Sequence, residues 1–316
     1  MDRPRLVRGG DQRAIASLLR DLDDGKEEAA TELRALTAGV AAPFVVGITG
    51  PAGAGKSTLV DGLVTRLRAR GEPVGVVAVD PSSAAPTGGA VLGDRVRMQR
   101  HATDPGVFIR SLGTRGARGG LSAGALDIVA ALGAGGFGTV LLETVGVGQA
   151  ETDVAAAADV VVVVLVPGLG DGVQALKAGL LEIADILVVN KADRAEAERA
   201  EADLAGMLDV RRAAHAGAGD AGGVAIPILR TVATSGEGVD ELLGAIEKAR
   251  GAASPGRRRV RAALRIEQAV LARVGARVRT ALASEEGGRL VDDVAAGRSD
   301  AGQAAEALMS RFRGGY

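Results

Sequence analysis

Short apolar runs alternate with longer segments of helical periodicity over most of the chain. The runs are rich in β-branched residues, and they occupy positions 44–49, 74–79, 107–111, 139–142, 159–166, 186–189 and 226–232. Nearly continuous apolar runs are typical of strands buried on both faces, so they predict a mostly parallel sheet. Helical spacing is found between them, at 57–70, 121–132, 173–183, 194–212 and 239–250. This order predicts an α/β fold with a doubly wound sheet.

The two ends of the chain have only the helical pattern. Near the N-terminus, apolar residues recur at helical spacing over 11–38, and Gly25 interrupts them. Beyond position 256, the apolar stripe consists of Leu264, Val270, Leu271, Val274, Val278 and Leu282. We therefore predict an N-terminal helical extension over 1–40, an α/β domain over 41–251 and a C-terminal helical arm over 257–316. The arginines at 257, 258, 259 and 261 favour a solvated helix start over a binding patch.

The composition excludes several classes of function. The 38 Lys and Arg residues balance 39 Asp and Glu, so the net charge does not favour a nucleic-acid partner. The chain has no Cys, which excludes disulfides and thiolate metal sites. The apolar run at 160–166 is too short to cross a bilayer, and the first residues lack an apolar signal segment. We expect a cytoplasmic protein that does not enter a membrane.

A glycine-rich segment between the first predicted strand and the next predicted helix matches the Walker A motif, GxxxxGK[ST]. Its residues are Gly50, Pro51, Ala52, Gly53, Ala54, Gly55, Lys56 and Ser57, followed by Thr58. Glycines let the backbone turn its N–H groups onto phosphate oxygens, and a helix N-terminus adds a favourable dipole. We expect residues 50–58 to bind the phosphates of a nucleotide. Lys56 would contact the β- and γ-phosphates as a catalytic residue, and Ser57 would ligate Mg²⁺.

A second motif indicates which base is bound. Asn190, Lys191 and Asp193 form an NKxD motif after the sixth apolar run. The Asp193 carboxylate can accept hydrogen bonds from the N1–H and the 2-amino group of guanine, a donor pair that adenine lacks. The motif therefore predicts GTP and GDP as ligands rather than ATP. Ser235, in the loop after the last run, is predicted to lie under the base. An ordinary strand-to-helix loop is the alternative.

Carboxylates after other predicted strands indicate the rest of the site. Glu143 and Gly146 follow the fourth run, where GTPases usually have DxxG. We expect Glu143 to hold Mg²⁺ through water and to take part in catalysis. The Gly146 N–H would approach the γ-phosphate, so that the residues after it sense the nucleotide. Gln149 either orients the attacking water or is an ordinary loop residue. Asp80 and Asp94 are further candidates for the magnesium shell, and a helix N-cap is the alternative for Asp94.

Three longer segments, together with these motifs, resemble one family. They are Val79–Met98, Phe108–Ser122 and Glu143–Gln149. The family is the MeaB-type metallochaperone GTPases, which attend adenosylcobalamin-dependent acyl-CoA mutases such as methylmalonyl-CoA mutase. The resemblance implies a chaperone that gates cofactor loading and protects the mutase, with slow GTP hydrolysis that the partner stimulates. It also implies a homodimer formed through the C-terminal arm, and the mutase's cobalamin adenosyltransferase as a further partner.

Three other functions compete with this interpretation. A nickel-insertion GTPase would need Cys or His for its metal, and the chain has only His101 and His215. A transport-associated kinase or ATPase is disfavoured by the guanine motif. An interaction module that binds nucleotide without hydrolysing it would show no turnover, even with the mutase present. If the chain is a GTPase, hydrolysis is aided either by Gln149 or by an arginine such as Arg115 or Arg118.

Overall fold

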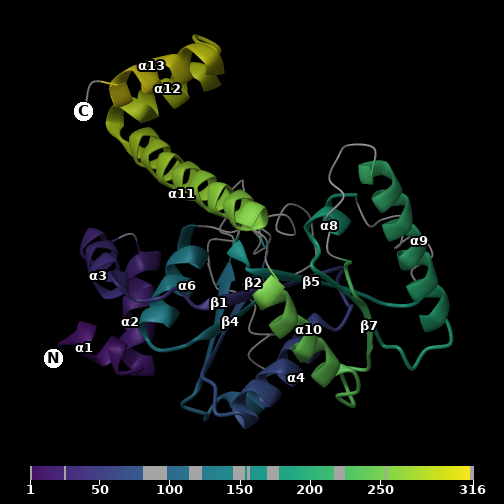
Figure 1. Cartoon of the computed structure of the whole chain (residues 1–316). Coiled ribbons are helices and arrows are strands. Elements are labelled where there is room, and N and C mark those ends of the chain that lie inside the picture. Colours follow the sequence, from purple (N-terminus) through teal and green to yellow (C-terminus); the bar gives the residue numbers. More distant parts are fainter. Residues whose placement is uncertain are drawn as a thin grey trace. The chain divides into compact units, whose positions relative to one another are not determined.

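The structure, a computed structural model, divides the chain into two compact units, Met1–Ala262 and Ala263–Tyr316. The residues that it describes are 2–24, 26–80, 98–113, 123–144, 154, 157–168, 178–216, 225–252 and 255–313. The first unit contains a sheet of seven strands with helices on both faces, and the second unit is built of helices (Figure 1).

All the strand pairs of the described sheet are parallel. The strands are β1 (Phe44–Thr49), β2 (Val74–Asp80), β3 (Val107–Gly113), β4 (Thr139–Thr144), β5 (Val160–Leu165), β6 (Ile186–Asn190) and β7 (Ile228–Thr231). Their order across the sheet is β3-β2-β4-β1-β5-β6-β7. This confirms the predicted doubly wound α/β fold. β7 is shorter than the predicted run because the chain turns after Thr231, where Val232 forms an isolated antiparallel bridge with Glu237.

Each face of the sheet is covered by its own helices. The helices beside the sheet are α4 (Lys56–Ala69), α6 (Ala123–Ala134), α8 (Ala178–Ile183), α9 (Ala197–Ala216) and α10 (Val239–Ala252). The helices α4 and α10 share one apolar core, and α6, α8 and α9 share the other. Along β5, Val160, Val162 and Val164 belong to the first core, whereas Val161 and Val163 belong to the second. Because successive side chains point to opposite faces, this double burial explains the continuous apolar runs.

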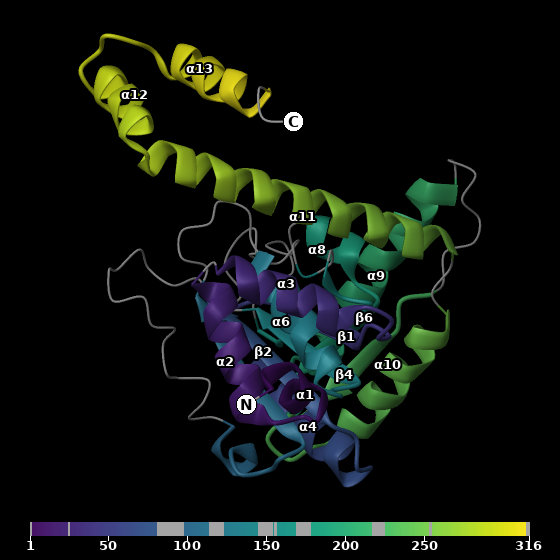
Figure 2. The ribbon, with the colours of Figure 1, turned by 90° about the vertical axis from the view of Figure 1, so that its left-hand side faces the viewer.

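Three N-terminal helices form an additional layer over α6. They are α1 (Arg3–Arg8), α2 (Gln12–Asp23) and α3 (Glu27–Thr37), and Figure 2 shows them beside α6. Ile15 and Leu36 are fully buried in the core that these helices share with α6. Asp11 begins α2 by accepting a hydrogen bond from the Ala14 N–H at 2.7 Å. The N-terminal helices are therefore an integral layer of the first unit.

An ion cluster ties these three helices together. Arg3 in α1 donates a hydrogen bond to Glu32 in α3 and pairs with Asp21 in α2, and Lys26 donates to Asp21 at 2.7 Å. The hydrogen bonds from Lys26 and then Arg3 lower the pKa of Asp21 to about 2. Because this pKa lies below the usual value for Asp, about 4, the cluster stabilises the fold above that pH. The contribution is lost as the pH falls toward 2.

The central strand β1 has a notch at Gly47, and the side chain of Val154 fills it. A Cβ added at Gly47 in β1 would lie 2.2 Å from Val154 Cγ1 and 2.9 Å from Ala158 Cβ. Val154 and Ala158 are fully buried. Glycine is therefore required at position 47 by the close approach of its neighbours.

The C-terminal helices are α11 (Pro255–Ala283), α12 (Glu285–Ala295) and α13 (Ala301–Arg313). Ser284 begins α12 by accepting a hydrogen bond from the Gly287 N–H at 3.2 Å. The guanidinium of Arg277 lies 5.2 Å from the ring centroid of Phe312, which joins α11 to α13. The helical pattern of the predicted arm thus corresponds to three helices.

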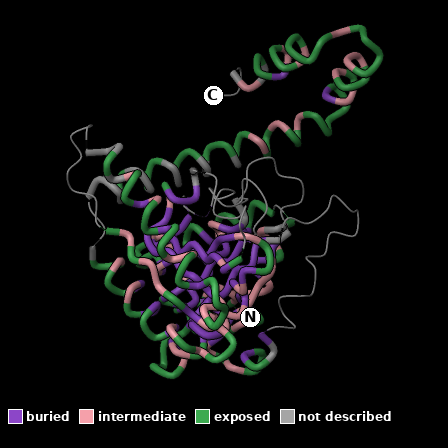
Figure 3. Tube along the Cα trace, turned by 90° about the vertical axis from the view of Figure 1, so that its right-hand side faces the viewer, coloured by how far each residue is buried: buried purple, intermediate pink, exposed green. Residues whose placement is uncertain are grey.

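Apolar side chains of the second unit are exposed to an unusual degree. Ile266, Val270, Leu271 and Val274 on α11 are between 45% and 66% exposed, and Figure 3 shows long stretches of exposed residues on these helices. An exposed apolar stripe of this kind marks an interaction surface more often than a solvated helix. Among the described helices, none is both long enough and apolar enough to cross a membrane.

Candidate nucleotide-binding site

The predicted ligand-binding residues that the structure describes lie at one edge of the sheet, where its parallel strands end. β1 leads into the loop at 50–55, β6 ends at Asn190, and β7 leads into the loop at 232–238. β4 and β5 flank β1, so the chain after β1 builds one side of the sheet and then the other. In doubly wound sheets, this reversal of strand order opens a crevice in which ligands bind. The topology therefore places the candidate site at the end of β1.

The loop at 50–55 has the backbone shape needed to wrap around an anion. Gly50, Gly53 and Gly55 have φ angles of 139°, 76° and 89°. A Cβ at Gly50 would lie 2.0 Å from the carbonyl oxygen of Val164, and a Cβ at Gly55 would lie 2.3 Å from Asn190 Nδ2. Only glycine satisfies both the angle and the space. Gly55 is also the N-cap of α4, so the loop leads directly into a helix N-terminus, where the helix dipole favours an anion.

Lys56 and Ser57 are buried at the start of α4. The Lys56 ammonium donates hydrogen bonds to the carbonyl oxygens of Gly50 at 2.8 Å and Pro51 at 2.9 Å, so it lies within the loop. Ser57 Oγ donates to Glu143 Oε1 at 2.6 Å. The structure therefore brings together the hydroxyl and the carboxylate that the sequence predicts beside one Mg²⁺ ion.

This pair fits Mg²⁺ in its chemistry. Mg²⁺ is usually bound by one or two protein oxygens, with phosphate oxygens and waters completing its shell. Over the described part of the chain, no three His, Cys, Asp or Glu side chains gather into a metal cage. A magnesium ion held by Ser57, by Glu143 and by the nucleotide itself needs no such cage.

Asn190 connects the phosphate side of the site with the base side. Its side chain is buried, and Nδ2 donates a hydrogen bond to the Ala54 carbonyl at 2.7 Å. Oδ1 accepts hydrogen bonds from Thr231 Oγ1 at 3.0 Å and from the Ala233 N–H at 3.1 Å. One amide thus joins the segments that follow β1 and β7 to the end of β6. Asn190 therefore holds the loops of the candidate site together.

The turn after β6 presents the rest of the guanine motif. Lys191 has a φ of 58°, which is uncommon for a residue other than glycine. Its ammonium donates a hydrogen bond to the Gly53 carbonyl at 2.9 Å, so this turn is also tied to the phosphate loop. Asp193 lies exposed two residues later. A carboxylate in this position is accessible to the edge of a base.

Ser235 has a local role in its loop. Its Oγ donates a hydrogen bond to the Val232 carbonyl at 3.1 Å and accepts one from the Glu237 N–H at 3.4 Å. The side chain therefore supports the turn, and its predicted contact with the base stays a prediction.

Several predicted site residues lie outside the described part of the chain. They are Asp94, Gly146 and Gln149, together with the candidate arginines Arg115 and Arg118. Asp80 ends β2, where it pairs with Gly113 of β3, and β4 separates β2 from β1. The structure thus brings together the motifs on β1, β4 and β6, and the other predictions for the magnesium shell and the nucleotide-sensing segment stay predictions.

One contact near the site was not predicted from the sequence. Arg66 in α4 donates a hydrogen bond to the carbonyl of Gly236, in the loop after β7. Its neighbours Arg68, on the same helix, and Arg70, the C-cap of that helix, pair with other partners. The three arginines alternate with Leu67 and Ala69 and look equivalent in the sequence, so no sequence signal distinguishes Arg66.

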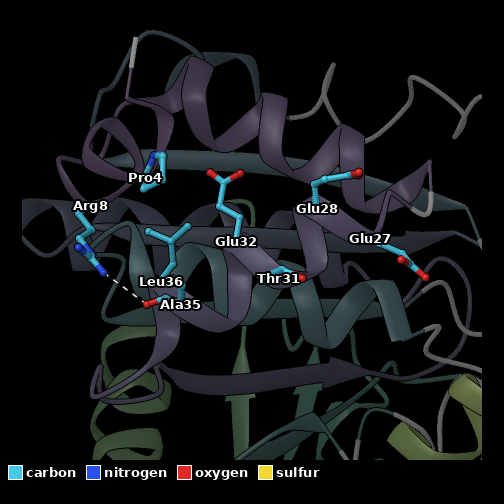
Figure 4. A pocket seen from close by; sticks show the side chains of 8 residues that line it. All are labelled: Pro4, Arg8, Glu27, Glu28, Thr31, Glu32, Ala35 and Leu36. Carbon is cyan, nitrogen blue, oxygen red and sulfur yellow. Dashed lines mark hydrogen bonds between the residues drawn. The ribbon is translucent and has the colours of Figure 1, made fainter.

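A hollow of about 530 Å³ lies between the N-terminal helices, away from these motifs (Figure 4). Its lining residues are Pro4, Arg8, Glu27, Glu28, Thr31, Glu32, Ala35 and Leu36. Three of them are carboxylates, which would repel the phosphates of a nucleotide. The hollow is therefore a poor candidate for the nucleotide site that the sequence predicts at the end of β1.

The sheet order, the phosphate loop and the NKxD turn together define a P-loop GTPase, a class of guanine-nucleotide-binding enzymes. The chain belongs to the family described as methylmalonyl-CoA mutase-associated GTPase MeaB, whose model matches residues 12–286. This confirms the predicted family and the predicted GTPase activity.

Known proteins extend this assignment. A proposed GTPase of Pyrococcus horikoshii is 50% identical over 75% of this chain and 73% of its own. A protein of Cupriavidus metallidurans named fused isobutyryl-CoA mutase is 38% identical over 65% of this chain, a segment that makes up 19% of that longer protein. The crystal structure of a LAO/AO transport system kinase matches with a TM-score of 0.64 and 24% identity, and the match covers 99% of this chain and 97% of that one. At that identity, the match supports the fold alone.

Proposed function

We propose that this GTPase is a chaperone for an adenosylcobalamin-dependent acyl-CoA mutase of the methylmalonyl-CoA mutase type. It would gate the loading of the cofactor and protect the mutase from inactivation. The observation that carries the proposal is the relative in which a similar segment belongs to one polypeptide with a mutase. Covalent linkage holds two domains at a high effective concentration, which favours a joint function. The family description, which names association with a mutase, supports the same conclusion.

The reaction that we propose is hydrolysis of GTP to GDP and phosphate, slow in the free protein and faster with the partner bound. Lys56 would exchange its bonds to Gly50 and Pro51 for the β- and γ-phosphate oxygens. The loop N–H groups of residues 50–58 would hold the remaining phosphate charge. Mg²⁺, when bound, neutralises phosphate charge, and Ser57 and Glu143 would hold it. Most of the catalysis is then positioning and charge stabilisation.

Asp193 would select guanine, with Asn190 and Lys191 holding the surrounding turns. The exposed carboxylate lies after the turn that Lys191 joins to the phosphate loop. Paired acceptors at that position match the N1–H and 2-amino donors of guanine.

The nucleotide-sensing part of the proposal rests on residues that the sequence predicts. Asp80 and Asp94 would complete the magnesium shell, and the Gly146 N–H would meet the γ-phosphate. Gln149 would act in the segment after Gly146. GDP lacks the γ-phosphate, so these residues would distinguish the two nucleotides and report the difference to the mutase.

We also propose that the protein is cytoplasmic and that it forms a homodimer through its C-terminal arm. The exposed apolar side chains of α11 support it, because a second copy would remove them from water. The cobalamin adenosyltransferase of the same pathway is part of this proposal as a further partner. Size-exclusion chromatography with light scattering tests the dimer, and Val270→Asp and Leu271→Asp together should give a monomer.

The decisive experiment measures GTP turnover and nucleotide affinity with and without each B12-dependent acyl-CoA mutase of the source organism. We expect one mutase to raise turnover and to change GTP affinity by roughly 5–150-fold, because linkage between two ligands is reciprocal. Gln149→Ala and Asp94→Ala should uncouple the mutase from GTP while GDP binding is nearly intact. If no mutase changes either quantity, the chaperone proposal is rejected and only a GTPase remains.

A further inference from the structure

Arg66 reaches from the last turn of α4 to the loop that follows β7. Its Nη2 donates a hydrogen bond to the Gly236 carbonyl at 2.7 Å. Nε and Nη2 also donate to the Asp240 carboxylate at 2.9 and 3.1 Å, in the first turn of α10. Nη1 donates to the Gly62 carbonyl in its own helix at 3.3 Å. The guanidinium is thus fixed by contacts to three segments.

The loop that Arg66 holds is folded into a narrow turn. The N–H groups of Ser235 and Gly236 donate to the Val232 carbonyl at 3.1 and 2.9 Å, and the Val232 N–H donates to the Glu237 carbonyl at 3.0 Å. Gly238 has a φ of 73°, and a Cβ there would lie 2.0 Å from the Arg230 carbonyl oxygen. The glycines and the backbone hydrogen bonds therefore restrict the turn to one conformation.

Two side chains anchor this turn from outside. Asn190 accepts a hydrogen bond from the Ala233 N–H at its beginning, and Arg66 donates to the Gly236 carbonyl near its end. Thr234 and Ser235 lie between the two anchors and are exposed. Since the first anchor belongs to the guanine motif, the exposed part of the turn lies next to the residues proposed to bind the base.

We infer that Arg66 is a positioning residue for guanine. This inference rests on the proposed recognition of guanine by the motif at 190–193. Arg66 holds the turn at 232–238 in the place where its backbone contacts the base. Because α4 begins with Lys56, one rigid helix fixes both the phosphate loop and the base loop. Ten residues of helix span about 15 Å, so the distance between the two halves of the site is set by α4.

Arginine suits this position better than lysine. The planar guanidinium presents several donors in a fixed fork, so it can serve the Gly236 carbonyl and the Asp240 carboxylate together. The Asp240 side chain is 72% exposed, and an ion pair so open to water contributes little by itself. The bond to the loop carbonyl is therefore the contact through which Arg66 acts on the ligand.

The test compares substitutions of Arg66, in the last turn of α4, and of Arg70, the C-cap of that helix. Arg66→Met keeps the apolar stem and removes the donors, and Arg70→Met does the same to an arginine that pairs with Glu247 in α10. Both variants lose one ion pair between α4 and α10, but only the first loses a bond to the loop. The measurements on the full chain are the melting temperature and the dissociation constants and dissociation rates of GDP and IDP.

We expect Arg66→Met to weaken GDP and IDP about equally, by about five- to tenfold, mainly through faster dissociation. The two bases present the same ring face and 6-carbonyl to the loop, and they differ in the 2-amino group proposed to meet Asp193. The ratio of the two affinities should therefore stay as in the wild type. Arg70→Met should bind both nucleotides as the wild type does, at a similar melting temperature. Arg66→Lys should recover part of the affinity.

Two outcomes would overturn the inference. If Arg66→Met binds GDP as tightly as Arg70→Met, the arginine does not position the base loop. If nucleotide affinity falls only in step with the melting temperature, and Arg66→Lys recovers neither, its role is structural. Failure of the proposed guanine recognition would give a different result, since the wild type would then bind ADP as well as GDP. A folded Asp240→Ala variant, which keeps the loop bond, should stay within about twofold of the wild type.

Discussion

The phosphate side and the base side of the site are held in place by different means. On the phosphate side, the loop shape depends on three glycines with positive φ, and the backbone approaches Val164 and Asn190 too closely for any side chain. On the base side, a longer turn is held by two side chains: Asn190 accepts a hydrogen bond from the Ala233 N–H, and Arg66 donates one to the Gly236 carbonyl. The phosphate loop therefore tolerates few substitutions, whereas the turn on the base side depends on separate contacts.

This difference predicts how each side of the site responds to substitutions. Backbone geometry is lost as a whole when it is disturbed, because the glycine positions have no alternative residue. Side-chain hydrogen bonds contribute about 0.5–1.5 kcal/mol each and can be removed one at a time. We expect substitutions on the phosphate side to abolish function and those on the base side to give graded losses.

The largest effect is expected from Lys56→Ala on the phosphate side. Turnover should fall by on the order of 100- to 1,000-fold or more, because the charge that stabilises the transferred phosphoryl group is removed. Single-turnover GTP hydrolysis measures this loss. Lys248→Ala, which changes an exposed lysine on α10, is the control and should keep full activity. Undiminished turnover in Lys56→Ala would refute the assignment of the phosphate loop.

The next effect is expected from Asp193→Asn on the base side. The amide cannot accept both guanine donors, so GTP affinity should fall by about 2–4 kcal/mol from unmatched polar groups. Xanthine nucleotides should gain affinity, because the amide suits their exchanged donor and acceptor. Competition assays with GTP, XTP and ATP measure the change. Equal competition by ATP against the wild type would show that guanine selection is absent.

Asn190→Ala should affect stability as well as binding, because it removes contacts that join the two sides. Asn190 is 1% exposed, and its side chain takes part in three hydrogen bonds, with Ala54, Thr231 and Ala233. Leaving buried partners unsatisfied should lower the free energy of unfolding by about 1–3 kcal/mol. Urea unfolding in the absence of nucleotide measures this. A stability equal to the wild type would mean that the two loops are held independently.

The smallest effect is expected from Ser235→Ala, which removes an exposed hydroxyl from the base loop. Its bonds to Val232 and Glu237 are local, so both stability and GDP affinity should change by less than about 1 kcal/mol. Isothermal titration with GDP measures the affinity. A loss of tenfold or more would indicate that the hydroxyl contacts the base directly, as the sequence predicts.

Local patterns in the sequence were enough to predict the strands and the motif positions. Continuous apolar runs identified β1 and β5, since both faces of a central strand need apolar residues. The motif residues Lys56 and Asn190 were identified by their spacing after the apolar runs that form β1 and β6. Such signals work because one strand or one turn contains all the information.

The contacts between distant segments could not be predicted in the same way. Ser57 and Glu143 are 86 positions apart, and only the register of β1 against β4 brings them together. Arg66 and Gly236 are 170 positions apart, and their bond depends on how α4 packs beside α10. The motifs predicted Ser57 and Glu143 beside one Mg²⁺ ion, but tertiary packing decides the direct bonds in both pairs, and no single motif contains that information.

The notch at Gly47 limits the routes by which this chain can evolve. A methyl group at position 47 and the γ-methyl of Val154 compete for one space, since they would lie 2.2 Å apart. Gly47→Ala on its own would overpack the core, whereas Val154→Ala first opens room for it. The two changes are therefore expected to depend on their order, with Ala158 yielding slightly in the double variant. Homologous chains that have a side chain at position 47 should have a smaller residue at position 154.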